Sequence, residues 1–412
     1  MTAYRLFRAA ASVLLALTVN SCVFPYDTDF EGQTGELPLV VEGDIIIGGI
    51  TTINLDRVRP FEEPQEEQWG RYIMTNVEAY IEGEDGTRVE GDLYTPYDYY
   101  SSSYYFSAPT ATIHFDTQDL RSDQRYRLHL KVLCSGADAP DTYESAWVSV
   151  NPAPVIDGLT YQANIPDEEL EIGLSMHCRG AHRFRWFFEE DWEFHAELNS
   201  SFMFDTESFL VKPYDDYRTQ NTYFCWRHFQ DYEARTFSTV NQTDDRFEDL
   251  KFHTVSLKDK RLQILYRIRV HLSAISDDAF IYWETMRQNS EEQGSLFAPT
   301  PSQLPGNIRC TSNPSAQVIG FVDACQEIMG EMYYDNTRDH YFIPGKPILF
   351  ESVQIPNIEM WNSDYYYNHE YRPYQSVSNS YGETEYLWAP DFCVDCRRNG
   401  GTKIKPEDWP RD

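Results

Sequence analysis

Residues 261–275 read RLQILYRIRVHLSAI, and this stretch decides the fold class. Every second residue in it is large and apolar: Leu262, Ile264, Tyr266, Ile268, Val270 and Leu272. Successive side chains of a β-strand point to opposite faces, so this pattern predicts one buried face and one wetter face. We expect the stretch to form a long strand near the centre of a β-sheet.

A helix is predicted directly after this strand, over residues 276–294. Ser276 suits the N-cap, the two aspartates that follow favour the positive end of the helix dipole, and Gly294 suits the C-terminal end. Three apolar side chains recur at helical spacing: Phe280, Trp283 and Met286. We expect this stripe to pack against the sheet while the charged remainder faces solvent.

Short alternating segments upstream predict a first domain over residues 38–152. They are residues 39–48, 50–58, 76–91, 110–117, 125–133 and 144–150. Asp85 and Gly86 are a favoured pair for a tight hairpin turn within the third segment. Short strands at regular spacing are typical of a β-sandwich, here of immunoglobulin-like type. The two prolines in NPAPVIDG, residues 151–158, interrupt the pattern and predict a domain boundary.

Residues 153–412 predict a second β-rich domain with one helix. Residues 169–178 and 181–191 resemble strands, as residues 261–275 do. Residues 294–308 contain three prolines, and residues 326–388 are polar and tyrosine-rich with few periodic runs. We therefore expect long Tyr/Pro-rich loops and short strands around the second sheet, and a mainly β fold class for the whole chain.

The first 37 residues predict a secreted chain with a lipid anchor. Arg5 and Arg8 precede an apolar run at residues 9–19, which is too short to span a bilayer but suits a signal peptide. The sequence VNSC at residues 19–22 then resembles a bacterial lipobox. We expect residues 1–21 to be removed, Cys22 to be acylated, and residues 22–37 to act as a flexible tether. The alternative is an ordinary signal peptide in which Cys22 is incidental.

The composition argues against several classes of function. A net charge of −32 repels phosphate backbones, so nucleic acid is not an expected partner. The motifs His-Glu-x-x-His, Gly-x-Ser-x-Gly and Gly-x-Gly-x-x-Gly are missing, and the ten histidines are scattered. We expect a protein that is not an enzyme and has no catalytic residues, cofactor or metal site. Calcium binding and a carbohydrate hydrolase stay open as alternatives without a motif to support them.

Seven cysteines follow Cys22, and export makes disulfides their expected state. An odd number leaves one thiol unpaired or paired outside the chain. Five residues are disulfide candidates: Cys225, Cys310, Cys325, Cys393 and Cys396. Cys310 and Cys325 flank a predicted hairpin and could be bridged across it. The stretch CVDC at residues 393–396 fits a structural disulfide, with half of a zinc site or a redox motif as the alternatives.

Two tyrosine-rich segments, residues 94–106 and 364–374, are possible binding surfaces. The residues in question are Tyr97, Tyr99, Tyr100, Tyr104, Tyr365, Tyr366, Tyr367 and Tyr371. Tyrosine offers apolar area with a polar tip, which suits a protein partner, and its ring can also stack on a sugar. The segments can therefore contact a partner protein or a glycan, or they can pack within their own domain.

Several motifs together resemble a family of Bacteroidetes outer-membrane lipoproteins, domain-of-unknown-function family 4249. They are the lipobox, VVEGDI at 40–45, PVID at 154–157, CW at 225–226, LYRIRVHLSAISDDAFIYW at 265–283, GSLFAPTPSQLPGNI at 294–308, VIGFVDA at 318–324 and CVDCRRNGGTKIKPEDW at 393–409. The resemblance implies a lipid-anchored protein of the outer membrane, on its periplasmic or cell-surface face, that works beside a TonB-dependent receptor. We therefore expect a non-enzymatic accessory or docking subunit of such a receptor or of another surface complex. A glycan-binding surface lipoprotein is the alternative.

Overall fold

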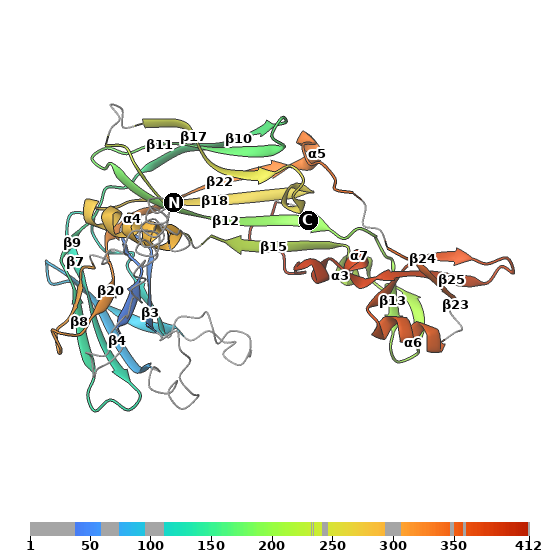
Figure 1. The fold of residues 1–412 in the computed structure, drawn as a ribbon, viewed down its shortest axis with the longest axis horizontal. Coiled ribbons are helices and arrows are strands. Elements are labelled where there is room, and N and C mark those ends of the chain that lie inside the picture. Colours follow the sequence, from blue (N-terminus) through green and yellow to red (C-terminus); the bar gives the residue numbers. More distant parts are fainter. Residues whose placement is uncertain are drawn as a thin grey trace, which may run out of the picture.

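The structure is a computed structural model that describes residues 38–58, 74–94, 111–231, 233, 235–240, 246–292, 306–346, 350–356 and 360–410. Its elements are mainly β-strands, which confirms the predicted fold class. Figure 1 shows two bodies of β-sheet and a smaller lobe, which extends from the second body on the side away from the first. Within the ranges given, no helix has the length and apolar character needed to cross a membrane.

The first body, here called the first sandwich, is one continuous sheet that folds around a single core. It uses β1 (Leu39–Glu42), β3 (Ile50–Arg57), β4 (Met74–Gly83), β5 (Arg88–Tyr94), β6 (Ala111–Asp116), β7 (Arg125–Cys134) and β8 (Asp141–Ser145). β5 pairs with β4 on one edge and with β6 on the other, and so it joins the two halves of the sheet that face each other. Side chains from both halves of the sheet, such as Leu55, Phe115 and Leu130, are buried in one cluster. The predicted hairpin at Asp85 and Gly86 connects β4 to β5.

Three strands from much later in the chain complete the first sandwich: β19 (Ile308–Cys310), β20 (Val318–Gly320) and β21 (Ala324–Cys325). β19 pairs with β8, β20 runs parallel to β1, and β21 runs parallel to β2 (Ile45–Ile46). β9 (Val148–Ser149) pairs with β7 just before the predicted boundary. The sequence pattern places residues 308–325 in the second domain, whereas in the structure their strands pair with the first sandwich. Period-two alternation identifies a strand but does not say which sheet the strand joins.

The second body, the second sandwich, consists of two facing sheets. One contains β10 (Val155–Asn164), β11 (Glu169–His177) and β17 (Arg246–Ser256); the other contains β12 (Arg183–His195), β15 (Phe224–Gln230), β16 (Arg235–Ser238), β18 (Leu265–Ala274) and β22 (Glu327–Asp335). β18 lies between β12 and β22, so the predicted central strand is confirmed. Ile268 on this strand shares a buried cluster with Leu170 and Ile172 of the opposite sheet. The strand begins at Leu265, since residues 260–262 form a short 3-10 helix capped by Asp259.

The predicted helix is α4 (Asp277–Glu292), and it lies between the two sandwiches (Figure 1). Ser276 caps it, because its hydroxyl accepts a hydrogen bond of 3.2 Å from a backbone amide of the first turn. Trp283 is buried in a cluster with Phe321, which lies between β20 and β21, and Phe280 and Met286 pack against that cluster. The predicted apolar stripe is therefore confirmed, and it links the second sandwich to the first.

We call the lobe at the far end the terminal lobe (Figure 1). It contains β13 (Phe202–Asp205), β14 (Leu210–Pro213), α3 (Tyr217–Gln220), β23 (Val353–Pro356), α6 (Met360–Asn368), β24 (Tyr371–Ser378), β25 (Thr384–Pro390) and α7 (Asp391–Val394). Trp388 is fully buried in its core beside Phe204. The expectation of one helix in residues 153–412 is corrected by the four-residue helices α3, α5 (Asn336–Asp339) and α7 and by α6, a helix of nine residues. Its sequence has no apolar stripe at helical spacing, so local periodicity does not reveal it.

Candidate functional site

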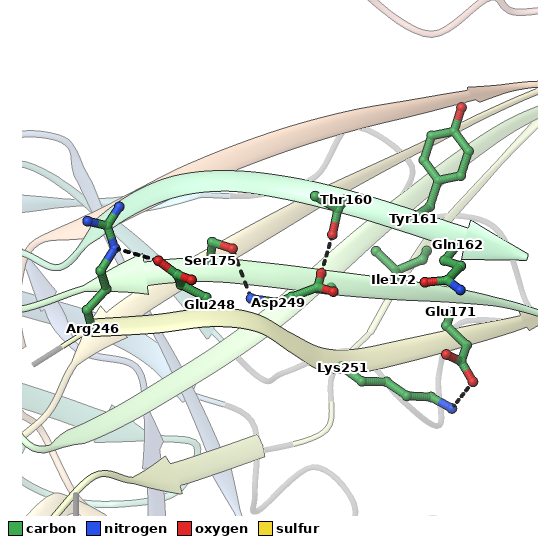
Figure 2. A pocket seen from close by; sticks show the side chains of 11 residues that line it. Thr160, Tyr161, Gln162, Glu171, Ile172, Ser175, Arg246, Glu248, Asp249 and Lys251 are labelled. Carbon is green, nitrogen blue, oxygen red and sulfur yellow. Dashed lines mark hydrogen bonds and ion pairs between the residues drawn. The ribbon is translucent and has the colours of Figure 1, made fainter. Parts of the chain in front are cut away.

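The outer face of the β10–β11–β17 sheet contains an open groove of about 450 Å³, here called the sheet groove (Figure 2). All three strands contribute to its walls. Its lining includes eight polar or charged side chains: Thr160, Gln162, Glu171, Ser175, Arg246, Glu248, Asp249 and Lys251. The opposite face of the same sheet covers the core of the second sandwich, so the groove is carried by a rigid element.

Gly173 gives the carboxylate of Asp249 room to lie on the floor of the sheet groove. A Cβ atom at this position would lie 2.2 Å from Oδ1 of Asp249 and 2.9 Å from the hydroxyl oxygen of Thr160. The pairing of β11 with β17 shifts register immediately before Gly173 and again between Leu174 and Met176. Such bulges bend a strand and redirect its side chains. The polar hollow of the sheet groove therefore takes its shape from a glycine and two irregular pairings that meet at one point of the sheet.

Asp249 forms one wall of this hollow in a constrained conformation. Its φ is 54°, in the left-handed region that residues with a Cβ atom rarely adopt. Its amide donates a hydrogen bond of 3.0 Å to the hydroxyl of Ser175, and its carboxylate accepts one from the hydroxyl of Thr160. Bonds to the other two strands of the sheet thus hold a strained backbone and its carboxylate in one position.

Ion pairs form the rim of the sheet groove. Lys251 lies 2.8 Å from the carboxylate of Glu171, and Arg246 lies 3.6 Å from that of Glu248. Hydrogen bonds from Asn164 and Lys251 lower the pKa of Glu171, and the bond to Glu171 raises the pKa of Lys251. Both charges of the Glu171–Lys251 pair are therefore present at neutral pH, and they largely cancel each other.

A second groove, of about 520 Å³, lies on the outer face of the first sandwich and contains Tyr80. The guanidinium of Arg88 lies 3.6 Å from the centre of the Tyr80 ring, and the ring of His129 stacks on it at 4.3 Å. Neighbours this close must lie on opposite sides of the ring. Tyr80 is therefore already covered by the protein and offers no free face to a ligand.

Glu190 is the most enclosed carboxylate of the second sandwich core. It accepts hydrogen bonds from Arg261 at 2.8 Å and from the hydroxyl of Tyr266 at 2.6 Å. Its carboxylate also lies 3.0 Å from Nε2 of His253. Burial opposes its ionised form, but the bonds from His253, Arg261 and Tyr266 together lower the pKa of Glu190. Burial also raises the pKa of Tyr266 well above its usual value. A carboxylate satisfied by three partners stabilises the core and is poorly placed to act as an acid or base.

Asp191 points to the other face of the same strand and pairs with Arg267 at 2.7 Å. Both side chains are only 2% exposed, because the C-terminal segment covers them. Arg267 donates to the carbonyl oxygen of Glu407 at 3.1 Å, and the ring of Trp409 lies over its guanidinium. Trp409 in turn donates to Glu193 at 3.2 Å. Asp191, like Glu190, therefore contributes to packing, here between β12, β18 and the C-terminal segment.

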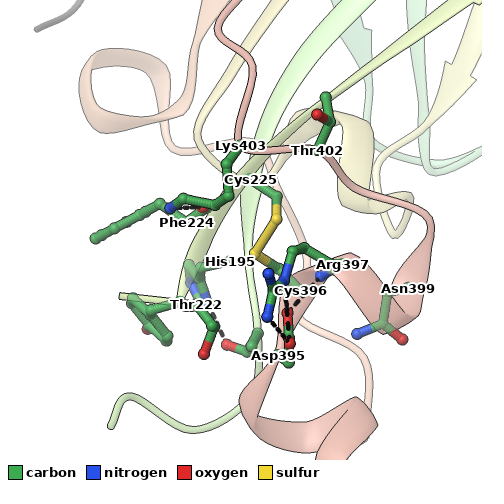
Figure 3. The surroundings of a disulfide bond; sticks show 12 residues. His195, Thr222, Phe224, Cys225, Asp395, Cys396, Arg397, Asn399, Thr402 and Lys403 are labelled. Carbon is green, nitrogen blue, oxygen red and sulfur yellow. Dashed lines mark hydrogen bonds and ion pairs between the residues drawn. A yellow bond between two sulfur atoms is a disulfide. The ribbon is translucent and has the colours of Figure 1, made fainter. Parts of the chain in front are cut away.

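A disulfide joins Cys225 on β15 to Cys396, next to the terminal lobe (Figure 3). Asp395 and Arg397 form an ion pair of 2.6 Å beside it, and Thr402 pairs with Trp226 on the same strand. The bridge therefore ties the end of the chain to the edge of the second sandwich.

Three disulfide candidates are corrected, since Cys310, Cys325 and Cys393 are buried free thiols. The segment between Cys310 and Cys325 is not a hairpin, because β19 and β21 pair with β8 and β2. Cys393 faces a small apolar cluster with Leu198, while Cys396 reaches Cys225 instead. Burial raises the pKa values of Cys325 and Cys393, which makes both thiols poor nucleophiles.

The tyrosine candidates do not form one exposed platform. Tyr366, Tyr367 and Tyr371 pack against the core of the terminal lobe, and Arg372 lies over the ring of Tyr367. Tyr365 is 55% exposed and stacks on His369. Tyr97, Tyr99, Tyr100 and Tyr104 lie outside the described residues, as does the lipidation candidate Cys22.

Sequence reasoning does not single out the sheet groove or the two buried carboxylates. Thr160 and Asp249 are 89 residues apart, and Glu190 and Arg261 are 71 apart. The one local signal is Gly173 inside an alternating strand, which suggests a bulge but not a hollow. Among the residues that the structure describes, no group of three or more His, Cys, Asp or Glu side chains is arranged to hold a metal ion.

Comparisons with known proteins place the chain in a family without an assigned function. The family model described as "Domain of unknown function (DUF4249)" matches residues 24–330. No curated protein matches the sequence. Among solved structures, a DUF4785 family protein from Legionella pneumophila is similar over 56% of this chain and 51% of that chain, with 10% identity and a TM-score of 0.19. The chain thus spans about half of that protein, and so low a TM-score supports no statement about fold or function.

Proposed function

The chain belongs to the DUF4249 family, and we propose that this member is a non-enzymatic lipoprotein of the outer membrane that docks on a TonB-dependent receptor or similar surface complex through its terminal lobe. The exposed aromatic side chains of that lobe are the observation that carries the proposal. The lipobox and the resemblance to outer-membrane lipoproteins supply its location.

Exposed aromatic side chains are concentrated in the terminal lobe. Eight aromatic side chains are exposed among the described residues, and five of them belong to this lobe: Phe209, Tyr217, Tyr365, Tyr381 and Phe392. Tyr381, at the turn between β24 and β25, is 88% exposed. Single exposed apolar residues are ordinary, but a concentration of aromatics is typical of surfaces that bind proteins. Tyrosine is also among the residues that contribute most to binding energy at such surfaces.

The charges of the terminal lobe favour a basic partner. Lys212, Arg397 and Arg398 are each in an ion pair with an aspartate of the lobe. Glu207 and Glu370, by contrast, form no ion pair with any residue that the structure describes. The lobe therefore presents uncompensated negative charge beside its aromatic rings. Such a surface steers lysine- or arginine-bearing faces toward it and can bind their cations on its rings.

Membrane attachment in this proposal comes from Cys22. A lipid on this residue and a tether over residues 22–37 would let the folded part stand at a membrane protein without inserting into the bilayer. The terminal lobe lies on the far side of the second sandwich from the first, whose first strand directly follows the tether (Figure 1).

Affinity capture from detergent-solubilised outer membranes tests this function. We expect the tagged wild-type protein to recover a receptor in near-stoichiometric amount, and the double variant Tyr365→Ala/Tyr381→Ala to recover at least tenfold less. The matched control is Ile50→Ala/Leu93→Ala, which removes two exposed apolar side chains from the first sandwich. Absence of any stoichiometric membrane protein from the wild-type sample, or equal loss in both double variants, would contradict the proposal.

A further inference from the structure

We propose that the sheet groove is a binding site for a short, uncharged oligosaccharide. This inference does not depend on the docking function, because the groove lies on the β10–β11–β17 sheet and not on the terminal lobe (Figure 2). It rests on the Asp249 carboxylate that Gly173 admits to the groove floor, on the constrained backbone of Asp249 and on the arrangement of hydrogen-bonding groups around them.

The hollow is built into the sheet and is not a gap between mobile side chains. A residue with a Cβ atom at position 173 would displace the carboxylate of Asp249, so glycine at this position lets the carboxylate lie in the groove. Asp249 keeps its left-handed backbone through bonds to Ser175 and Thr160 on the other two strands of the sheet. Strained residues next to bulges are characteristic of sites where a ligand is held.

The polar groups of the hollow are poised to bind hydroxyl groups. The hydroxyl of Thr160 donates to Asp249, so its lone pairs can accept a further hydrogen bond. The hydroxyl of Ser175 accepts from the amide of Asp249, and its own proton has no acceptor among the described residues. The second carboxylate oxygen of Asp249 is an additional acceptor, and the amide of Gln162 offers both a donor and acceptors. A ligand with several hydroxyl groups, each a donor and an acceptor, matches this set.

The charge of the groove disfavours ionic ligands. Glu171, Glu248 and Asp249 would repel an anion, whereas Arg246 and Lys251 would repel a cation. The cations are engaged with the carboxylates of Glu248 and Glu171, so among the described residues the carboxylate of Asp249 is the one charge of the groove without a paired cation. A neutral polyol avoids both penalties and can still accept hydrogen bonds from Lys251.

The size of the groove fits a short oligosaccharide. Its volume of about 450 Å³ lies within the range of small-molecule sites, roughly 300–1,000 Å³. It runs across three strands and is open to solvent, which suits an extended chain of two or three sugar units better than a compact enclosed ligand. The groove offers hydrogen bonds from its polar side chains, so we expect a dissociation constant of the order of 1 mM.

Saturation-transfer NMR on the folded protein, with maltose, cellobiose and lactose as probes, tests this inference. We expect at least one disaccharide to give a saturable signal, and glucuronate and glucosamine to give signals at least fivefold weaker. The variant Gly173→Ala should weaken binding at least tenfold, because the new methyl group displaces the Asp249 carboxylate. The matched control is Gly158→Ala on β10, where a Cβ atom would meet nothing within 4 Å.

A second variant keeps the test decisive if Gly173→Ala folds poorly. Ser175→Ala removes one hydroxyl without filling the hollow, and we expect it to weaken binding several-fold while circular dichroism stays unchanged. The inference is overturned if none of the three disaccharides binds at tens of millimolar. It is also overturned if a variant with normal circular dichroism, Gly173→Ala or Ser175→Ala, binds as tightly as Gly158→Ala. Because neither result involves a membrane protein, failure here is distinguishable from failure of the docking function.

Discussion

The backbone amide of Asp323 donates a hydrogen bond of 3.1 Å to the carboxylate of Asp44, a residue 279 positions earlier in the chain. Asp44 also forms an ion pair of 2.5 Å with Arg185 on β12 of the second sandwich. The carboxylate of Asp323 accepts a hydrogen bond of 2.7 Å from the amide of Ser276, at the start of α4. The first sandwich, the second sandwich and α4 therefore meet at one buried polar cluster.

This cluster should make stability depend on pH. Burial raises the pKa of Asp323 from 3.8 to about 6, so the folded protein holds its proton more tightly than the unfolded chain does. The resulting contribution is fully present below about pH 4 and is lost as the pH rises through 6. It amounts to about 3 kcal/mol at most. We expect Asp323→Asn to lose less stability than the wild type between pH 4 and pH 7, as measured by urea unfolding at several pH values. A difference between the two proteins that is constant with pH would contradict this assignment.

Reduction of the Cys225–Cys396 disulfide should destabilise the protein. The bridge joins residues 171 positions apart, and closing so long a loop in the unfolded chain is worth about 3–5 kcal/mol. We expect the double variant Cys225→Ser/Cys396→Ser to unfold at a lower guanidinium concentration than the wild type, and a reductant to leave the variant unaffected. The control is Cys393→Ser, which changes a buried thiol three residues away and keeps the bridge. Equal midpoints for oxidised and reduced wild-type protein would refute the prediction.

Replacement of Arg267 should be far more costly than replacement of an exposed arginine. Arg267→Met leaves the buried Asp191 with only Arg269 at 3.2 Å and the half-exposed His228, and losing one member of a buried pair costs about 3–5 kcal/mol. The control Arg309→Met removes a pair with Glu144 in which the arginine is 77% exposed, worth about 0–1 kcal/mol. Urea unfolding measures both losses. Similar losses for the two variants would show that Asp191 does not need its buried partner.

Substitution of Cys22 should release the protein from the membrane. An acylated cysteine holds a chain at a bilayer through its buried CH₂ groups, whereas Cys22→Ser cannot be acylated. We expect the wild type to remain in the membrane fraction and the variant to move to the supernatant after cell lysis. Mass spectrometry of the native N-terminal peptide is the direct check, since an unmodified thiol at position 22 is incompatible with the anchor.

Local pattern was sufficient for several elements of the fold. The strand at β18 and the helix at α4 are both predicted, because their apolar residues recur at the periods of a strand and a helix. The hairpin between β4 and β5 is predicted from Asp85 and Gly86, since the φ of 89° at that glycine is what its turn requires. These signals depend only on neighbours in the chain.

Pairing between distant segments was not predictable in the same way. The parallel pairing of Val40 with Ile319 closes a loop of more than 250 residues. Neither segment contains a sequence feature that identifies the other as its partner. The partner of Cys396 is likewise Cys225 and not a nearer cysteine, because β15 and the segment after α7 are brought together by the terminal lobe. The groove depends on Gly173 and Asp249, which are ordinary residues until β11 and β17 pair with a shifted register.

The sequence alone therefore determined the mainly β class, the central strand, the helix that follows it and the family, since each of these follows from periodicity or motif along the chain. Only the tertiary structure decided that residues 308–325 return to the first sandwich, which cysteines are bridged, which tyrosines are buried, and that a polar hollow exists on an outer sheet face. The physical reason is that side chains far apart in the chain acquire neighbours, burial and charge partners only when their strands pair, and it is those neighbours that turn common residues into a core, a bridge or a site.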